Sequence, residues 1–160
     1  MNRATYIENV EIWQQGFVFS LPIKVRFCET DMFGHVNNTT VFTYLEEARI
    51  EFFKSLGLMQ NWMNQDSTLI PVAADLQCDF LAQTFFDEVL EVFVKINKIG
   101  RTSLDLHYQC LKADGQLAFV GRGTIVQINK DSGKATEWNE EWRLILHSTM
   151  ETIRAGLTHQ

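Results

Sequence analysis

The sequence predicts an α+β fold in which an antiparallel β-sheet wraps around one long central helix and a second helix follows at the C-terminus. Two observations predict it. The segment 39–56 carries apolar residues at helical spacing over most of its circumference, and such a helix must be enclosed by a large apolar surface. After it, four segments alternate apolar and polar residues between turn residues, which is typical of antiparallel strands.

The segment before the central helix predicts one short strand and an extension. Ile23, Val25 and Phe27 alternate with polar residues, which indicates a strand over 23–28 that leads directly into a turn. Residues 1–16 show no consistent period. We therefore expect an irregular N-terminal extension or a partner-binding arm there.

The central helix is bounded by recognisable start and stop residues. Asn37 or Asn38 can cap a helix that begins near Thr39, because a side-chain oxygen at that place accepts a free backbone N–H. Gly57 is a natural stop. Residues 60–68 lack either period and predict a surface loop.

The remaining chain supplies the sheet and the last helix. The alternating segments predict strands over 72–80, 91–96, 103–110 and 116–128, with turns at 113–115 and 131–133. Asn139 can cap a terminal helix over 139–156 with acidic residues in its first turn. No internal repeat or second domain is indicated, so residues 1–160 are expected to form one domain.

Composition excludes several classes of function. There are 14 Lys and Arg against 20 Asp and Glu, a net charge of −6, and no basic run, so nucleic acid is not expected as a partner. No stretch of about 18 apolar residues is present, and the first residues lack the apolar run of a signal peptide. We expect a cytoplasmic protein without membrane insertion. The three cysteines are well separated, odd in number and without CxxC spacing, which predicts buried free thiols.

The run RFCETDMFGHVNNTTVFTYLEEAR, residues 26–49, carries the chemistry. It places Asp31 where a strand is expected to end and Gly34 and His35 in the turn that leads to the helix start. A helix N-terminus offers free backbone N–H groups and partial positive charge. Such a site suits a carbonyl oxygen that gains negative charge during acyl transfer.

The same run resembles a known enzyme family. The element order is that of the hot-dog fold, and the chain is similar to the acyl-CoA thioesterases of that fold, the 4-hydroxybenzoyl-CoA thioesterase family. The likeness covers roughly residues 20–137 in element order and is most specific in the first block. The residues that carry it are Arg26, Glu29-Thr30-Asp31, Gly34-His35-Val36-Asn37-Asn38, Tyr44 and Glu46-Glu47-Ala48-Arg49, with weaker support from Gly100-Arg101-Thr102-Ser103 and Asp114-Gly115.

The resemblance implies a thioester hydrolase that needs no metal and no cofactor. Asp31 would act as general base toward water or as a nucleophile that forms an acyl anhydride, and these two routes stay open. The backbone N–H of Asn38 would hold the oxyanion, with Gly34 permitting close backbone approach. His35 would orient substrate or water, or simply fix the turn by side-chain hydrogen bonds. Asn37 is a substrate-binding candidate, although capping alone would also explain it.

Further substrate-binding candidates each have a structural alternative. Glu46 is a candidate because some relatives of this fold place a catalytic glutamate on the helix, but an ion pair with Arg49 at i, i+3 accounts for it and is the favoured interpretation. Arg101 could meet the CoA phosphates, although such cations are usually solvated. Thr102 and Ser103 could contact the pantetheine arm or the reacting water, or hydrogen-bond locally.

Two other functions remain open from the sequence. A hot-dog enoyl-CoA hydratase or dehydratase would use an aspartate and a histidine together. Relatives with that activity have the histidine five positions after the aspartate with a proline between, whereas here the spacing from Asp31 to His35 is four and no proline intervenes. A non-catalytic acyl-binding role is the third interpretation.

The resemblance also suggests the substrate and the assembly. The segments TDMFGHVNN and LEEAR are most similar to fatty acyl members, which implies medium- to long-chain acyl-CoA, with an acyl carrier protein thioester as an alternative. One sheet around one helix leaves open edges. We therefore expect a homodimer or homotetramer, with residues of the partner chain at the site.

Overall fold

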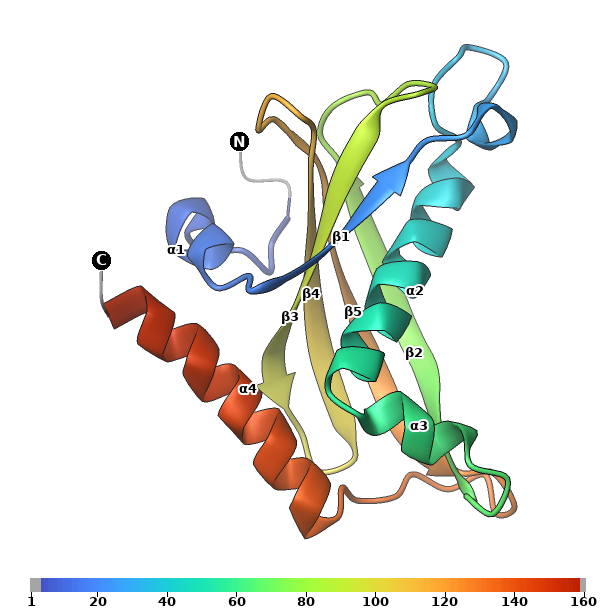
Figure 1. The fold of residues 1–160 in the computed structure, drawn as a ribbon, viewed down its shortest axis with the longest axis vertical. Helices are drawn as coiled ribbons and strands as arrows, with labels where there is room; N and C mark the ends of the chain where they lie inside the picture. Colours follow the sequence, from blue (N-terminus) through green and yellow to red (C-terminus); the bar gives the residue numbers. More distant parts are fainter. Residues whose placement is uncertain (1–3, 159–160) are drawn as a thin grey trace.

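The computed structural model describes residues 4–158, and Figure 1 shows a sheet with helices on both sides. Five strands form one antiparallel sheet in the order β1-β3-β4-β5-β2. The strands are β1 (Phe19–Lys24), β2 (Leu69–Phe80), β3 (Val89–Ile99), β4 (Ser103–Leu111) and β5 (Leu117–Asn129). Strand β2 pairs only with β5, so its other edge is unpaired within the described chain.

The long helix α2 (Asn38–Ser55) lies across one face of this sheet, as the sequence predicts. Its buried side chains join alternate residues of the strands in the main core, among them Leu104, Leu106 and Tyr108 of β4. Close approach to β5 depends on Gly121, because a Cβ there would lie 3.3 Å from Leu45 and 2.9 Å from a β2 carbonyl oxygen. The predicted α+β fold is confirmed.

The predicted strand 23–28 is wrong in its second half. Strand β1 ends at Lys24, and a 3-10 turn, η1 (Phe27–Glu29), follows it. The Glu29 carboxylate accepts the backbone N–H of Arg26 at 2.8 Å. This bond between residues i and i+3 turns the chain out of the extended conformation, a contact that alternation of apolar residues does not reveal.

The N-terminal extension is not irregular over its described part. Residues 4–17 include α1 (Val10–Gln15), whose N-cap Asn9 accepts the N–H of Ile12 at 3.0 Å. The segment lies on the sheet face opposite α2 (Figure 1), where Trp13 donates its indole N–H to Nδ1 of His107 at 2.7 Å. Ala4, Ile7, Trp13 and Val120 form a second buried apolar cluster. Residues 1–3 lie outside the described residues.

The segment predicted as a loop, 60–68, begins inside a helix. Helix α3 (Leu58–Met63) buries Leu58 and Trp62, a spacing of four residues that indicates a helical face. The Trp62 indole N–H donates to the Gln127 side chain at 3.2 Å and its ring packs edge-on against Trp142. Trp142 belongs to α4 (Glu140–Thr158), which corresponds to the helix expected over 139–156, with Asn139 accepting the Trp142 N–H at 2.8 Å.

The cysteines are free, as predicted, but not all of them are buried. Cys110 is buried, Cys78 is half-buried and Cys28 is exposed on η1. Burial raises the pKa of the Cys78 thiol to about 12. Among the helices described, none is long and apolar enough to cross a membrane.

Candidate active site

The loop between η1 and α2 is organised around the Asp31 carboxylate. Oδ1 of Asp31 accepts the backbone N–H of Phe33 at 2.8 Å and that of His35 at 3.2 Å. The main chain closes the same loop, because the Asp31 N–H donates to the His35 carbonyl at 2.7 Å. Oδ2 makes no hydrogen bond within residues 4–158. One carboxylate oxygen therefore shapes the turn while the other is available for chemistry.

Gly34 and His35 allow this turn in different ways. Gly34 has φ of +80°, a conformation that favours glycine. His35 fixes the turn through its backbone, and its ring packs edge-on against Phe85 at 5.2 Å between centroids. No ring hydrogen bond of His35 is found among the described residues. The hydrogen bonds that hold this turn within the described residues come from the Asp31 carboxylate and the main chain.

The start of α2 has the predicted cap. Asn37 is the N-cap residue, and its Oδ1 accepts the Thr39 N–H at 3.1 Å. Asn38 is the first helical residue, so no carbonyl four residues earlier in the helix is available to its N–H. Within residues 4–158 that N–H donates to no other group. It is a free donor at the positive end of an 18-residue helix.

Asp31 and Asn38 line the same pocket, which has a volume of about 440 Å³. Its walls mix polar and apolar residues and come from the loop, α2, the end of β2 with the segment after it, and the start of β5. The lining residues are Asp31, His35, Val36, Asn38, Val41, Phe80, Leu81, Ala82, Gln83, Thr84 and Phe119. The predicted catalytic residues Asp31, His35 and Asn38 thus meet at one cavity, with Gly34 in the adjoining turn.

The wall formed by residues 80–84 is absent from the sequence-based prediction. Thr84 is buried, and its carbonyl accepts the Val36 N–H at 2.9 Å. The N–H groups of Leu81 and Ala82 both donate to the Ala118 carbonyl at 2.9 Å. These contacts join segments far apart in the chain, and residues 81–84 lie between strands without a periodic pattern. No local signal identifies them.

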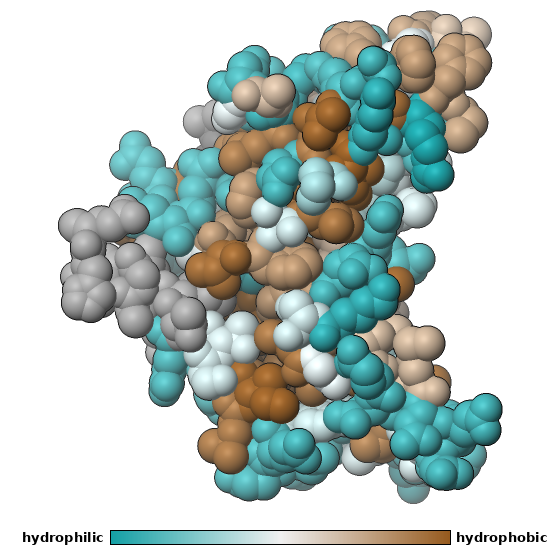
Figure 2. Space-filling view, viewed as in Figure 1, coloured by the Kyte–Doolittle hydropathy of each residue, from teal (hydrophilic) through white to brown (hydrophobic). Residues whose placement is uncertain are grey.

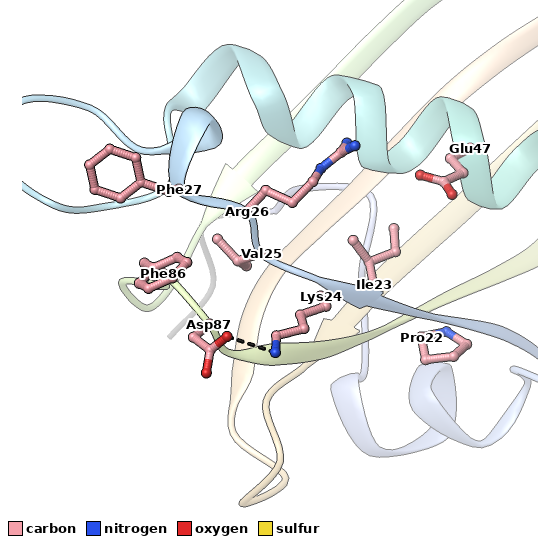
Figure 3. A pocket seen from close by; sticks show the side chains of 9 residues that line it. All are labelled: Pro22, Ile23, Lys24, Val25, Arg26, Phe27, Glu47, Phe86 and Asp87. Atoms are coloured by element: carbon pink, nitrogen blue, oxygen red, sulfur yellow. Dashed lines mark ion pairs between the residues drawn. The ribbon is translucent and has the colours of Figure 1, made fainter.

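A second groove of about 470 Å³ lies next to η1, between the end of β1, α2 and the 86–87 segment (Figure 3). Lys24 points to Asp87 and pairs with it at 2.7 Å. Arg26 pairs with Glu29 at 2.6 Å. Phe27 and Phe86 close one end and pack edge-on at 5.8 Å between centroids. Both cations are already paired. The carboxylate of Glu47 also lies at this groove, but no residue of the α2 start lines it, so the groove lacks the free helix-start N–H that Asn38 offers at the Asp31 pocket.

Apolar side chains gather on the surface around the Asp31 loop. Figure 2 shows hydrophobic atoms on the loop between β1 and α2 at one end of the molecule. Phe27, Met32 and Phe33 are 77%, 89% and 73% exposed there, and Phe86 of the neighbouring segment is 53% exposed. Met32 and Phe33 do not line the Asp31 pocket of this single chain.

Four predicted substrate-binding residues lie away from the Asp31 pocket within one chain. Glu46 lies 3.7 Å from Arg49 as the i, i+3 alternative predicts, and it lines a different cleft beside Pro71 and Ala73 of β2. Arg101 pairs with Glu137 at 2.7 Å on the surface. Thr102 and Ser103 lie at the opposite end of the sheet, since Ser103 pairs with Val126 whereas the pocket residue Phe119 pairs with Cys110.

The electrostatics of the loop centre on a buried carboxylate, Glu29. Its side chain accepts hydrogen bonds from Arg26 and from the hydroxyl of Tyr44 at 2.7 Å. Burial alone would raise the pKa of Glu29, but the bonds from Arg26 and Tyr44 outweigh it and hold the pKa below its ordinary value. Burial and the Glu29 hydrogen bond raise the pKa of Tyr44, which stays protonated as a donor.

Within the described residues, no cluster of His, Cys, Asp and Glu could hold a metal ion.

Residues 25–146 match the family model of the thioesterase-like superfamily. The uncharacterized protein YsmA of Bacillus subtilis is 43% identical over 137 residues, covering 85% of this chain and 90% of YsmA. The acyl-CoA thioesterase YbgC of Haemophilus influenzae is 28% identical over 87 residues, covering 54% of this chain and 64% of YbgC.

A solved structure resembles the whole fold. It is a thioesterase from Thermus thermophilus, complexed with coenzyme A and Zn, and it is 26% identical with a TM-score of 0.72. The similarity covers 85% of this chain and 97% of that one. The predicted hot-dog fold is confirmed by these likenesses.

Proposed function

The chain belongs to the thioesterase-like superfamily, and on this premise we propose that it hydrolyses acyl-CoA thioesters to a free acid and coenzyme A. The similarity to an acyl-CoA thioesterase and to a thioesterase complexed with coenzyme A supports this class of substrate. One observation carries the proposal. Asp31 and Asn38, which supply the carboxylate and the free N–H, line a single pocket of about 440 Å³.

The chemistry follows from these two groups. In the general-base route, Oδ2 of Asp31 takes a proton from water as the water oxygen bonds to the thioester carbonyl carbon. The carbonyl oxygen becomes an oxyanion, which the Asn38 N–H and the positive end of α2 stabilise. The C–S bond then breaks, and the coenzyme A thiolate takes up the proton held by Asp31.

A nucleophilic route uses the same residues. Oδ2 of Asp31 bonds to the carbonyl carbon, the C–S bond breaks, and an acyl anhydride forms before water hydrolyses it. Water that attacks the carbonyl of Asp31 leaves one solvent oxygen in the carboxylate. A single turnover in H₂¹⁸O with enzyme in excess, followed by mass spectrometry of the Asp31 peptide, tests for this route. Label in Asp31 establishes the anhydride, because the general-base route leaves Asp31 unlabelled.

The proposed substrate is a medium- to long-chain fatty acyl-CoA of the kind that the 4-hydroxybenzoyl-CoA thioesterase resemblance implies. Val36, Val41, Leu81 and Phe119 supply the apolar part of the pocket wall, and an apolar acyl chain would pack against these side chains. The exposed aromatic residues around the Asp31 loop extend this apolar surface. An acyl carrier protein thioester presents the same pantetheine arm and belongs in the same test.

We further propose that two chains pair through β2. Its free edge is long, and residues 72–75 are exposed on both faces. An exposed edge of this kind favours pairing with a strand of another chain over exposure of its backbone groups to solvent. Two-fold antiparallel pairing would set the Leu69 end of one β2 against the Phe80 end of the other. The end of the sheet that carries Ser103 would then approach the partner's Asp31 pocket.

This pairing accounts for the dispersed substrate-binding residues. Arg101, Thr102 and Ser103 would approach the pocket of the second chain rather than their own. Glu46 lines a cleft with Pro71 and Ala73 of β2, so it would lie close to the joined edges. Roles for Arg101 toward the phosphates and for Thr102 and Ser103 toward the pantetheine arm are therefore proposed across the subunit boundary.

The test is thiol release by the purified protein from acyl-CoAs of increasing chain length, benzoyl-CoA and an acyl carrier protein thioester. We expect hydrolysis with the highest kcat/KM on medium to long fatty chains. Intact thioesters together with hydration of enoyl-CoA would overturn the proposal in favour of a hydratase. Binding of acyl-CoA with neither reaction would instead indicate an acyl-binding protein.

A further inference from the structure

We propose that Glu29 is a positioning residue for the site, which holds Asp31 and the start of α2 at a fixed separation. This inference rests on the proposed function, because it concerns the same pocket. Glu29 is 8% exposed and lies two residues before Asp31 on η1. It does not line the Asp31 pocket, so any effect on turnover must act through other residues.

The Glu29 carboxylate is fully occupied by donors from two elements. Oε1 accepts hydrogen bonds from both Nε and Nη2 of Arg26, at 2.9 and 2.6 Å, within an ion pair. Oε2 accepts the Arg26 backbone N–H at 2.8 Å and the Tyr44 hydroxyl at 2.7 Å. Tyr44 is 1% exposed and belongs to α2. The carboxylate therefore fastens η1 to the helix whose first turn supplies the oxyanion donor.

The backbone of Glu29 fastens the same two elements a second time. Its carbonyl accepts the N–H of Asn37, the N-cap residue of α2, at 2.8 Å. Residues 30–36 form a closed loop between these anchored ends, with Thr30 bridged to Val36. Side chain and carbonyl together thus fix where η1 ends and where α2 begins, and Asp31 and Asn38 follow directly from those two points.

A buried carboxylate is a costly way to gain stability alone. Apolar residues of similar volume often serve a core as well as a buried ion pair does, whereas directional bonds fix one arrangement. Misplacement of reacting groups by about 1 Å can cost about 100-fold in rate. Glu29 is accordingly expected to affect kcat more than substrate binding.

The experiment compares Glu29→Gln and Tyr44→Phe with wild type under steady-state conditions. Gln keeps the size but loses the charge that holds Arg26, and Phe removes one hydrogen bond while keeping the ring. We expect kcat to fall about 10-fold or more for Glu29→Gln and about threefold or more for Tyr44→Phe, with KM within about twofold of wild type. Glu51→Gln is the matched control, because it removes an i, i+3 ion pair with Lys54 on the surface of the same helix.

A double-mutant comparison shows whether Glu29 acts through Asp31. If it does, adding Glu29→Gln to Asp31→Asn lowers kcat by less than about twofold further, although it lowers kcat about 10-fold alone. Full multiplication of the two effects would overturn the inference. Normal kcat in both Glu29→Gln and Tyr44→Phe would also overturn it. If Glu29→Gln is unfolded in a thermal melt, Tyr44→Phe decides by the same criterion.

The outcome separates this inference from the proposed function. If Asp31→Asn is inactive while Glu29→Gln and Tyr44→Phe are normal, the thioesterase chemistry stands and only the positioning role is wrong. If Asp31→Asn is as active as wild type, the proposed function of Asp31 is wrong. The proposal that Glu29 positions Asp31 for catalysis is then wrong as well.

Discussion

Oδ1 of Asp31 accepts the backbone N–H of Phe33 at 2.8 Å, which makes this aspartate a turn residue as well as the candidate reacting carboxylate. The two roles use different oxygens, since Oδ2 has no hydrogen bond within residues 4–158. A turn aspartate and a catalytic aspartate are therefore not competing explanations at this position.

We predict that Asp31→Asn lowers kcat for acyl-CoA hydrolysis by at least about 100-fold while the fold is kept. Asn retains the oxygen that accepts the Phe33 N–H, but it can act neither as a base nor as a nucleophile. Thiol release and a thermal melt measure the two properties. Asp114→Asn is the control, because Asp114 accepts the Gln116 N–H at 3.0 Å in a turn that does not line the pocket. Near-normal turnover of Asp31→Asn would move the chemistry elsewhere, with Glu46 the next residue to test.

For His35→Ala we predict a partial loss of kcat, about 10-fold. The backbone of His35 closes the turn with Asp31 and survives the substitution, so only the ring beside the pocket is removed. Steady-state kinetics on the preferred acyl-CoA give the result, with Phe85→Leu as the control for loss of the ring contact. A wild-type rate would show that the imidazole takes no part in turnover.

Trp13→Ala is expected to lower the free energy of unfolding by about 3 kcal/mol, the usual cost of emptying a large buried site. Trp13 is 8% exposed and packs against Phe17 and His107. Activity should stay within about threefold of wild type, because Trp13 does not line the Asp31 pocket. Urea denaturation measures the effect, and Ile12→Ala, at a position 61% exposed on the same helix, is the control. Equal stability of the two variants would contradict the packed N-terminal segment.

Because of His107, we predict that the free energy of unfolding falls in acid. Burial lowers the pKa of His107 from 6.5 to about 4, and the Trp13 N–H donated to Nδ1 requires the neutral ring. Nε2 lies 3.3 Å from Asp105 but without hydrogen-bond geometry, so the carboxylate does not reverse the shift. Between pH 6.5 and 4 the unfolded chain binds a proton that the folded chain does not, and stability falls as the pH falls.

The corresponding experiment is urea denaturation of wild type and His107→Gln at about pH 7 and about pH 4.5. The stability advantage of wild type should shrink by about 2 kcal/mol over this interval. His147→Gln, at an exposed position on α4, is the matched control. A wild-type advantage that is the same at both pH values would show that His107 does not titrate with folding.

Ala74→Lys is predicted to turn a dimer into a monomer. Ala74 is exposed and is skipped by the register between β2 and β5, so the single chain has no need of a small residue there. A charge on a strand edge opposes pairing between chains. Light scattering should change from a multiple of the chain mass of 18.5 kDa to that mass, with Leu144→Lys on α4 as the control. A wild-type protein that is already monomeric would overturn the proposed pairing.

Much of the fold is encoded in short-range patterns. The period of α2 and the alternation in the strands are local properties, and the structure confirms them with ends shifted by a few residues. Asn37 caps α2 as predicted because an Asx residue and its cap bond lie within two positions. The placement of Asp31 and Asn38 at one pocket also follows from their short separation along the chain.

Other features depend on contacts between distant segments. Residues 4–17 fold because Trp13 meets His107 and Lys95 on the sheet, and α3 forms where Trp62 packs against Trp142. In both cases the contacting residues lie far apart in the sequence, so hydrophobic periodicity does not indicate these contacts. Residues 80–84 become a pocket wall only because Ala118 and Val36 bind them.

The sequence by itself determined the long buried helix, the antiparallel strands and the loop that joins Asp31 to a helix start, since these depend on side chains within a few residues of one another. Only the tertiary structure decided what surrounds that loop. It gave the pocket its walls, joined Glu29 to Tyr44, and placed Glu46 and Arg101 away from Asp31 in one chain. Those outcomes depend on how strands pair and on which buried groups find partners across the chain, and local pattern does not specify either.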